Sequence, residues 1–185
     1  MKLVILDRDG VINEESPDFI RSPDAFRPIA GSLEAIARFT QAGVHVAIAT
    51  NQSGLARGYF DIDTLNRIHA LLCSRAAAIG GRIDLIAFCP HGPDAACSCR
   101  KPAPGLLQRV AKRFSVRLES VPVIGDSLRD LQAAERAGAQ PMLVRTGNGE
   151  KTARALPPSL ARVSVFRDLR AAAEALLSDA PDTQP

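Results

Sequence analysis

A chain of 185 residues is long enough to bury a core of its own and fits a single domain, so one function is expected of it. Its hydrophobic fraction of 46% and charged fraction of 23% are those of an ordinary globular protein, and a formal net charge of +3 is too mild to indicate nucleic acid binding. No apolar run approaches the roughly 20 residues that span a bilayer, and Asp7 interrupts the first run too early for a signal peptide, so we predict a cytoplasmic protein without a membrane partner.

Short apolar runs alternate with longer stretches of helical spacing. The runs resemble buried parallel strands and cover residues 3–6, 44–49, 83–88, 121–124 and 142–144. The helical stretches cover residues 32–42, 62–79, 105–114, 128–137 and 168–177. This order predicts one α/β domain over residues 1–177, a three-layer Rossmann-like arrangement with a mostly parallel central sheet and no separate cap domain. Residues 178–185 are predicted to be a disordered tail.

Polar residues follow three of the predicted strands. Asp7 comes after the first, Thr50 and Asn51 after the second, and Asp126 after the fourth. Ligands of open α/β sheets bind beyond the carboxyl ends of strands, so these residues are expected to converge on one crevice. The irregular stretch 11–28 carries three prolines and is long for a connection, which is more typical of a functional loop. We expect the crevice to be open, or covered only by this stretch and by a loop rich in cysteine.

Two carboxylates, Asp7 and Asp9, stand where the first strand runs into a turn at Gly10. One of them can attack phosphorus, while the other gives a proton to the departing alkoxide and later takes one from water. A polar turn with two solvated acids has the same local sequence. The pair alone therefore leaves both interpretations open.

Later segments carry groups suited to phosphate and metal. The hydroxyl and N–H groups that begin at Thr50 can hold a phosphoryl oxygen, unless they only form a turn. Lys101 can stabilise charge on the phosphoryl oxygens, although a surface lysine is the alternative. Asp126 can share Mg²⁺ with Asp7, because that ion prefers hard oxygen ligands, and Asp130 can simply complement a helix dipole.

In this order, the four segments resemble the motifs of the haloacid dehalogenase-like phosphatase superfamily, over the chain up to about residue 145. The resemblance implies an enzyme, a phosphoric monoester hydrolase. The catalytic residues that it implies are Asp7 as nucleophile, Asp9 as general acid and base, and Thr50 and Lys101 as phosphoryl stabilisers. The Mg²⁺ ligands that it implies are Asp7, the backbone carbonyl of Asp9, and Asp126. Asp130 is expected to orient Lys101 or metal-bound water rather than to contact the ion.

Four potential metal ligands fall within one short loop, namely Cys89, His91, Cys97 and Cys99. In a reducing compartment such thiols indicate a metal site rather than disulfides, and a Cys₃His set matches a closed, tetrahedral structural Zn²⁺ site. The spacing is tighter than in common zinc fingers, so reduced thiols in a turn are the alternative. A closed site leaves no position for a reacting water, and we expect it to fix the loop that leads into Arg100 and Lys101.

The cysteine loop narrows the resemblance. Together with Asp-Arg-Asp-Gly-Val-Ile-Asn at 7–13, Thr-Asn-Gln-Ser-Gly at 50–54 and Cys-Arg-Lys-Pro at 99–102, it is similar to heptose bisphosphate phosphatases. That family implies removal of the 7-phosphate of D-glycero-D-manno-heptose 1,7-bisphosphate through a phospho-aspartate, in the synthesis of ADP-heptose for lipopolysaccharide. The related histidinol-phosphate phosphatases of histidine biosynthesis are the alternative. Substrate-binding residues implied by the resemblance are Asp7, Arg8, Asp9, Glu15, Ser16, Pro17, Asp18, Thr50, Asn51, Gln52, Ser53, Arg100 and Lys101. Ser127 departs from many relatives, in which a lysine follows the metal-binding acid.

The cations also bear on the kind of partner. Arg57, Arg100 and Lys101 exceed what one phosphoryl group and Mg²⁺ require, which favours a doubly phosphorylated or otherwise anionic small substrate. We therefore expect a small phosphorylated sugar as substrate and no nucleic acid. A monomer is the default expectation, since no sequence feature determines the oligomeric state. A receiver module would need an acid after the third strand, where the chain has Phe88 and Cys89. A zinc-stabilised binding module with a dead active site would lack one of the catalytic residues, and all are present.

Overall fold

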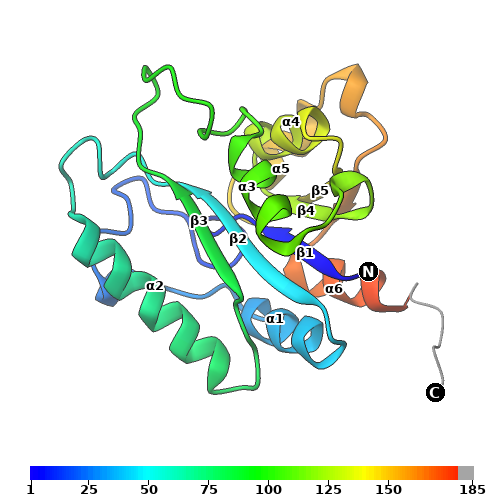
Figure 1. The fold of residues 1–185 in the computed structure, drawn as a ribbon, viewed down its shortest axis with the longest axis horizontal. Helices are drawn as coiled ribbons and strands as arrows, with labels where there is room; N and C mark the ends of the chain where they lie inside the picture. Colours follow the sequence, from blue (N-terminus) through cyan, green and yellow to red (C-terminus); the bar gives the residue numbers. More distant parts are fainter. Residues whose placement is uncertain (179–185) are drawn as a thin grey trace.

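Six strands form the central sheet of the protein, whose computed structural model describes residues 1–178 (Figure 1). The order across the sheet is β3-β2-β1-β4-β5-β6, and all neighbouring strands are parallel. The strands are β1 (Leu3–Leu6), β2 (His45–Asn51), β3 (Leu85–Cys89), β4 (Pro122–Gly125), β5 (Gln140–Val144) and β6 (Ser164–Phe166). The helices are α1 (Ser32–Gln41), α2 (Ile62–Ala77), α3 (Gly105–Phe114), α4 (Leu128–Arg136), α5 (Gly149–Arg154) and α6 (Leu169–Ser178). The predicted α/β class with a parallel sheet is confirmed.

All five predicted strands and all five predicted helices are present, with ends that differ by a few residues. The sequence did not predict β6 or α5, because three and six residues are too few to show a period. Within residues 1–178 no separate cap domain is seen, and no helix is long and apolar enough to cross a bilayer. Of the predicted tail, only Ser178 is described, as the last residue of α6.

The alternation of side chains along the strands divides the core into two layers. In β1, Leu3 and Ile5 point to the layer that contains α3 and α4, while Val4 and Leu6 point to the layer of α1, α2 and α6. All four side chains are buried. Because β1 is apolar and buried on both faces and lies between β2 and β4, the residue that follows it is placed near the centre of one edge of the sheet.

The chain changes direction in the sheet between β1 and β4. From β1 it builds outward to β2 and β3, and from β4 it builds outward on the other side to β5 and β6. Leu6 is paired with Ile124, and the N–H of Asp7 donates to the carbonyl of Ile124 at 2.9 Å. Asp7 and Asp126 therefore leave the sheet side by side, at the switch point where α/β sheets bind ligands.

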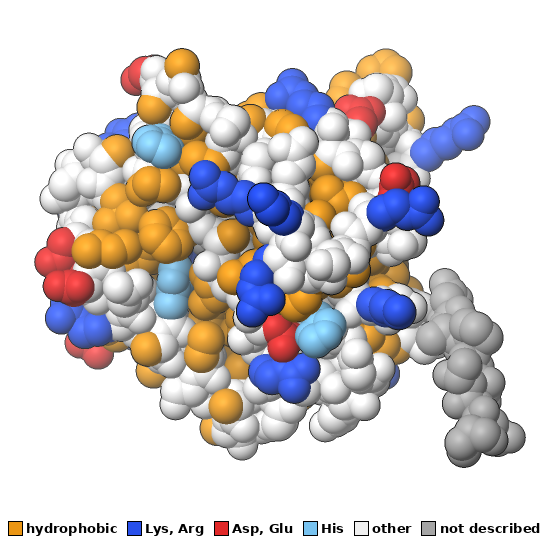
Figure 2. All heavy atoms as spheres, in the orientation of Figure 1, with side chains coloured by type: hydrophobic (Ala, Val, Ile, Leu, Met, Phe, Trp, Pro, Cys, Tyr) orange, Lys and Arg blue, Asp and Glu red, His pale blue; other side chains and the backbone are white. Residues whose placement is uncertain are grey.

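The long stretch 11–28 is anchored rather than loose. Val11, Ile12, Ile20 and Phe26 are buried, so the stretch is tied to the core at its start, in its middle and near its end. On the face drawn in Figure 2, Lys and Arg side chains are spread among acidic, hydrophobic and uncharged ones rather than gathered in one stripe.

Candidate active site

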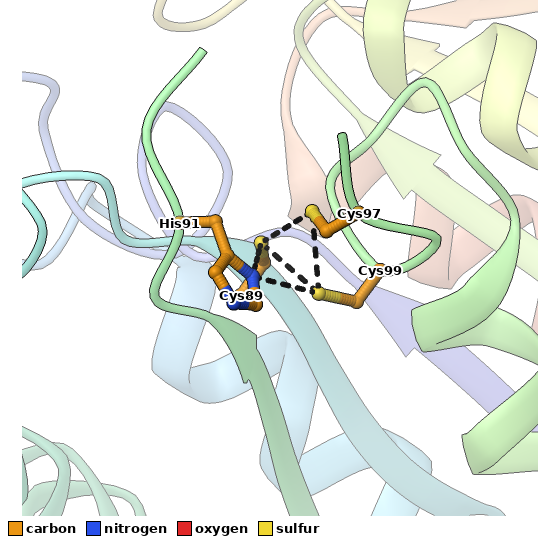
Figure 3. A group of neighbouring side chains, drawn as sticks. All are labelled: Cys89, His91, Cys97 and Cys99. Carbon is orange, nitrogen blue, oxygen red and sulfur yellow. Dashed lines mark hydrogen bonds between the residues drawn. The ribbon is translucent and has the colours of Figure 1, made fainter. Parts of the chain in front are cut away.

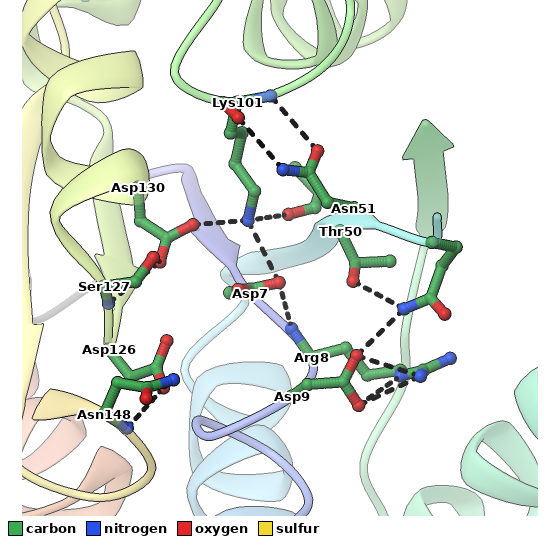
Figure 4. Close-up of polar contacts among 12 residues, drawn as sticks. Asp7, Arg8, Asp9, Thr50, Asn51, Lys101, Asp126, Ser127, Asp130 and Asn148 are labelled. Carbon is green, nitrogen blue, oxygen red and sulfur yellow. Dashed lines mark hydrogen bonds and ion pairs between the residues drawn. The ribbon is translucent and has the colours of Figure 1, made fainter. Parts of the chain in front are cut away.

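A cavity of about 330 Å³ opens at the carboxyl edge of the sheet. Its lining comes from the end of β2, from the loops that follow β1, β2, β3 and β4, and from the first turn of α4, and Figure 4 shows polar contacts at this site. Its lining includes all six acidic, hydroxyl and lysine groups predicted to be catalytic or near the metal: Asp7, Asp9, Thr50, Lys101, Asp126 and Asp130. The topology thus brings together side chains that are more than 100 residues apart in the sequence.

Lys101 is buried at the centre of this group, with 3% of its side chain exposed. Its Nζ lies 3.0 Å from Asp7 Oδ1 and 2.5 Å from Asp130 Oδ1, and it donates to the carbonyl oxygen of Ala49 at 2.7 Å. These three acceptors match the three donors of an ammonium group. Burial acts to lower the pKa of Lys101, but the carboxylates of Asp130 and Asp7 outweigh it and hold that pKa above its usual value. Lys101 is therefore a fixed positive charge in the cavity wall.

The acids around Lys101 outnumber it. Burial, with the charges of Asp130, Asp126 and Asp9, raises the pKa of Asp7 to about 8 against the opposing effect of Lys101. Burial and the Asp130 charge likewise raise the pKa of Asp126 to about 7. Oxygens of Asp7, Asp126 and Asp130 lie within 4.8 Å of one another. Buried carboxylates this close repel one another, and a divalent cation with oxygen ligands relieves that repulsion, so the residues fit Mg²⁺.

Hydrogen bonding separates the three acids by role. Asp130 is fully engaged, because Oδ1 faces Lys101 and Oδ2 accepts from the N–H and hydroxyl of Ser127 at 3.0 and 2.5 Å. Asp7 Oδ1 accepts from Lys101 and from the N–H of Arg8 at 2.7 Å, and Asp126 Oδ2 accepts from the N–H of Asn148 at 2.8 Å. Within residues 1–178, Asp7 Oδ2 and Asp126 Oδ1 accept no hydrogen bond. These two oxygens are the ones available to a metal ion or a substrate.

Asp9 is held in a different environment from Asp7. Arg8 Nη2 donates to both of its oxygens at 2.9 Å, Asn13 donates to Oδ1 at 2.8 Å, and Gln52 donates to Oδ2 at 2.9 Å. Burial acts to raise the pKa of Asp9, but the Arg8 charge and these hydrogen bonds outweigh it and place that pKa below its usual value. Two neighbouring carboxylates thus have pKa values displaced in opposite directions, as acid and base groups of one reaction often have.

The end of β2 and the residues that follow it support the site. Thr50 is buried and its hydroxyl accepts from Gln52 Nε2 at 2.9 Å. Asn51 binds the backbone of Lys101 on both sides, since Nδ2 donates to its carbonyl at 3.0 Å and Oδ1 accepts from its N–H at 3.1 Å. Ser53 is buried in the cavity wall. Asn51 was predicted to bind substrate, and in the structure its amide positions the loop that carries Lys101.

The other predicted substrate-binding residues are mostly brought to the cavity. Its lining includes Arg8, Glu15, Ser16, Pro17, Gln52 and Arg100. Asp18 does not line it.

Residues after β5 complete the metal side of the site, and sequence reasoning missed them. Besides the Asn148 contact, the hydroxyl of Thr152 donates to the carbonyl of Asp126 at 2.9 Å, and that of Thr146 donates to the carbonyl of Gly10 at 2.6 Å. The Gly-Asn-Gly turn at 147–149 follows a predicted strand end, and this was the available signal. The cavity lining also includes Phe19, Ile20, Pro93 and Arg129, for which no motif existed.

Ser127, where a lysine was expected, starts α4. Its hydroxyl and the Asp130 carboxylate form a capping box that closes the first turn of the helix. Arg129, in the same turn, lines the cavity. The first turn of α4 thus contributes a cation to the cavity lining although residue 127 is not one.

Gly10 is required by the close approach of two segments. Its φ is +80°, and a Cβ there would lie 2.1 Å from Asp126 Oδ2. We expect Gly10→Ala to lower the free energy of unfolding by about 2 kcal/mol or more and to raise the Mg²⁺ concentration needed for half-activity at least about tenfold. Gly43→Ala is the matched control, because Gly43 also has a positive φ, +69°, but nothing lies within 4 Å of its Cβ position. Denaturant titration and Mg²⁺ dependence of activity measure both effects, and equal Mg²⁺ dependence in the two variants would contradict the interpretation.

The cysteine loop gathers its four predicted ligands into one cluster (Figure 3). The S–S separations are 3.2, 3.6 and 3.8 Å, and His91 Nδ1 lies 3.3 Å from Cys99 Sγ and 3.5 Å from Cys89 Sγ. A disulfide would need about 2.05 Å, whereas a tetrahedron with Zn–S arms of about 2.3 Å has edges of about 3.8 Å. The donor set and its spacing therefore fit Zn²⁺. Arg100 Nη1 donates to the carbonyl of His91 at 3.2 Å, which ties this cation to the loop.

Known proteins resemble this chain along nearly its whole length. A family model described as HAD-hydrolase-like matches residues 98–172. The D-glycero-beta-D-manno-heptose-1,7-bisphosphate 7-phosphatase of Bordetella bronchiseptica is 56% identical, over 97% of this chain and 100% of that protein. The protein of the same name from Pseudomonas aeruginosa is 50% identical, over 95% of this chain and 97% of its own. The crystal structure of D,D-heptose 1,7-bisphosphate phosphatase from B. bronchiseptica, complexed with magnesium and phosphate, matches with a TM-score of 0.93 at 55% identity, over 97% of this chain and 100% of that one.

Proposed function

Because the chain belongs to the D-glycero-D-manno-heptose-1,7-bisphosphate 7-phosphatases of the haloacid dehalogenase-like family, we propose that it hydrolyses the 7-phosphate of this heptose bisphosphate, in its β-anomeric form. The observation that carries the proposal is the meeting of Asp7, Asp9, Lys101 and Asp126 in one cavity. The β anomer follows the names of the relatives. Small phosphorylated sugars also suit a cavity lined by several cations.

In the first step, a carboxylate oxygen of Asp7 attacks phosphorus, and the bond between phosphorus and the C7 oxygen breaks. The free Oδ2 of Asp7 supports this role, because no described donor blocks it. Asp9 gives a proton to the departing alkoxide, which requires its carboxyl group to be protonated and to leave its hydrogen bonds with Arg8 and Gln52. Lys101 lies where it stabilises negative charge on the phosphoryl oxygens.

In the second step, water attacks the phosphorus of phospho-aspartate, and the bond between Asp7 and phosphorus breaks. Asp9 takes the proton from that water as a carboxylate, the form that Arg8, Asn13 and Gln52 favour. Bound Mg²⁺ supplies positive charge that neutralises the phosphoryl oxygens and the acids around them. Asp7, Asp126 and the backbone carbonyl of Asp9 are the proposed ligands, and Asp130 holds Lys101 in place.

Phosphate release from candidate substrates tests the function. We expect turnover of heptose 1,7-bisphosphate, faster for the β than for the α anomer, and kcat/KM for histidinol phosphate at least about 100-fold lower. Faster turnover of histidinol phosphate would overturn the substrate assignment. Light scattering after size exclusion would test the expectation of a monomer.

We propose that the cysteine cluster binds a structural Zn²⁺ ion, which fixes the loop that leads into Arg100 and Lys101. The unchanged protein is expected to contain about one Zn²⁺ per chain, and Cys99→Ser is expected to contain less. Because Arg100 and Lys101 follow the cluster directly, Cys99→Ser is also expected to raise KM about tenfold with a smaller change in kcat. Cys73→Ser is the control, since Cys73 lies in α2 outside the cluster. Metal analysis and steady-state kinetics measure both variants. An unchanged KM in protein shown to be free of zinc would contradict the proposed role.

A further inference from the structure

Two loops beside the cavity contact each other through four side chains that lie outside the proposed catalytic group, a series of cation–π contacts and one pair of rings tilted by 58°. The guanidinium of Arg21 lies over the ring of Tyr59, 4.5 Å from its centroid. The Tyr59 ring lies 5.1 Å from that of Phe19, and the guanidinium of Arg57 lies 5.9 Å from the Phe19 centroid. We call this series, Arg21-Tyr59-Phe19-Arg57, the arginine-aromatic stack. It joins the stretch 11–28 after β1 to the segment between β2 and α2.

Each loop is turned and anchored so that its half of the stack faces the other. Phe19 has a φ of +64°, a backbone conformation that is unfavourable for a bulky residue and therefore needs support from the surrounding structure. The next residue, Ile20, is buried. Tyr59 is 41% exposed, but Phe60 beside it is buried against Gly54, where a Cβ would lie 2.3 Å from the Phe60 ring. The buried residues Ile20 and Phe60 thus hold the neighbouring rings of Phe19 and Tyr59 in place, and these two rings contact each other across the loops.

The inner end of the stack reaches the cavity. Phe19 and Arg57 both line it, as do Arg100 and Arg129. The three arginines lie close enough for Arg129 and Arg57 to act with burial in lowering the pKa of Arg100. In the described part of the chain, none of the three forms an ion pair with a carboxylate, whereas Lys101 is already paired with Asp7 and Asp130. Three arginines that line one cavity and form no close ion pair favour an anionic ligand.

We propose that Arg57, held by the arginine-aromatic stack, binds the phosphate of the substrate that is not hydrolysed. The cation–π contact with Phe19 holds the guanidinium of Arg57 beside the cavity, and within residues 1–178 its N–H groups donate to no protein acceptor, so they are available for a bidentate contact with phosphate. An exposed arginine without the stack would lose more side-chain entropy on binding, so the stack preorganises it. This role rests on the proposed function, and it makes Arg57 a determinant of preference for bisphosphates over monophosphates.

The test compares heptose 1,7-bisphosphate with heptose 7-phosphate, which lacks the second phosphate. For Arg57→Gln we expect KM for the bisphosphate to rise roughly 10- to 50-fold with kcat within about twofold, and kcat/KM for the monophosphate to change less than about twofold. Arg67→Gln is the matched control, because Arg67 is exposed on α2 and does not line the cavity. It should leave both substrates unchanged.

The stack itself is tested by Tyr59→Ala, with Tyr59→Phe as the variant that keeps the ring. Tyr59→Ala should raise KM for the bisphosphate about threefold or more, and Tyr59→Phe should not. In the double variant Arg57→Gln/Tyr59→Ala, KM should be no higher than in Arg57→Gln alone, since the stack acts through Arg57. Equal losses on both substrates, or additive effects of the two changes, would overturn the inference while the phosphatase assignment stands. If the unchanged protein does not hydrolyse the bisphosphate, the proposed function fails and this inference fails with it.

Discussion

Replacing Asp7 by Asn is expected to remove essentially all turnover, with kcat lower by on the order of 10⁴-fold or more, which corresponds to about 5.5 kcal/mol of barrier. An amide oxygen cannot form the phospho-aspartate, and the remaining charges can bind the substrate but not replace the attacking oxygen. Single-turnover assays with substrate that is radioactively labelled in the 7-phosphate measure both the released phosphate and the covalent intermediate. Near-normal rates in Asp7→Asn would exclude the covalent mechanism.

The same substitution should leave the fold intact, and this separates a chemical effect from unfolding. Asn can still accept the hydrogen bond from the N–H of Arg8, and Lys101 retains Asp130 and the carbonyl of Ala49. Because Asp7 is one of several buried carboxylates, removing its charge also reduces repulsion. We expect the melting temperature of Asp7→Asn without Mg²⁺ to equal or exceed that of the unchanged protein at pH 8. Binding of substrate should persist.

The fold and the meeting of the strand-end acids were predictable because each depends on local pattern. Asp7 and Asp126 follow apolar runs that are buried on both faces, and parallel topology alone brings such strand ends to one edge. The cysteine cluster was predictable for a related reason. Its ligands are separated by at most ten residues, so their meeting does not depend on how distant elements pack.

The rest of the site depends on contacts between loops, which no local pattern encodes. Arg57 lines the cavity and lies against Phe19, which belongs to another loop. Asn51 is engaged by the backbone of Lys101, fifty residues later in the chain, and nothing in its own segment distinguishes it from a ligand for phosphate. Asn148 contacts Asp126 only because β5 is adjacent to β4. In each case the role of a polar residue depends on a contact with a segment that is distant in the sequence and that only the folded chain brings close.

The stability of the protein without Mg²⁺ should fall as pH rises from about 6.5 to about 8.5. Asp7 and Asp126 have pKa values of about 8 and about 7 in the folded chain, against an ordinary value of 3.8. In that range the folded state therefore holds more protons than the unfolded state, and stability decreases with pH. The two shifts together correspond to a loss of about 3 kcal/mol across the range, or roughly 8 °C in melting temperature.

Mg²⁺ should reverse this dependence, because it binds the deprotonated acids and competes with their protons. Its effect on melting temperature is expected to be larger at about pH 8.5 than at about pH 6.5, since fewer protons must be displaced at the higher pH. Scanning calorimetry on protein dialysed free of Mg²⁺, with zinc content verified, measures both curves. The double variant Asp7→Asn/Asp126→Asn is the control and should lose both the slope and the Mg²⁺ response. The same slope in that variant would assign the pH dependence to groups other than the acid cluster at the carboxyl ends of β1 and β4.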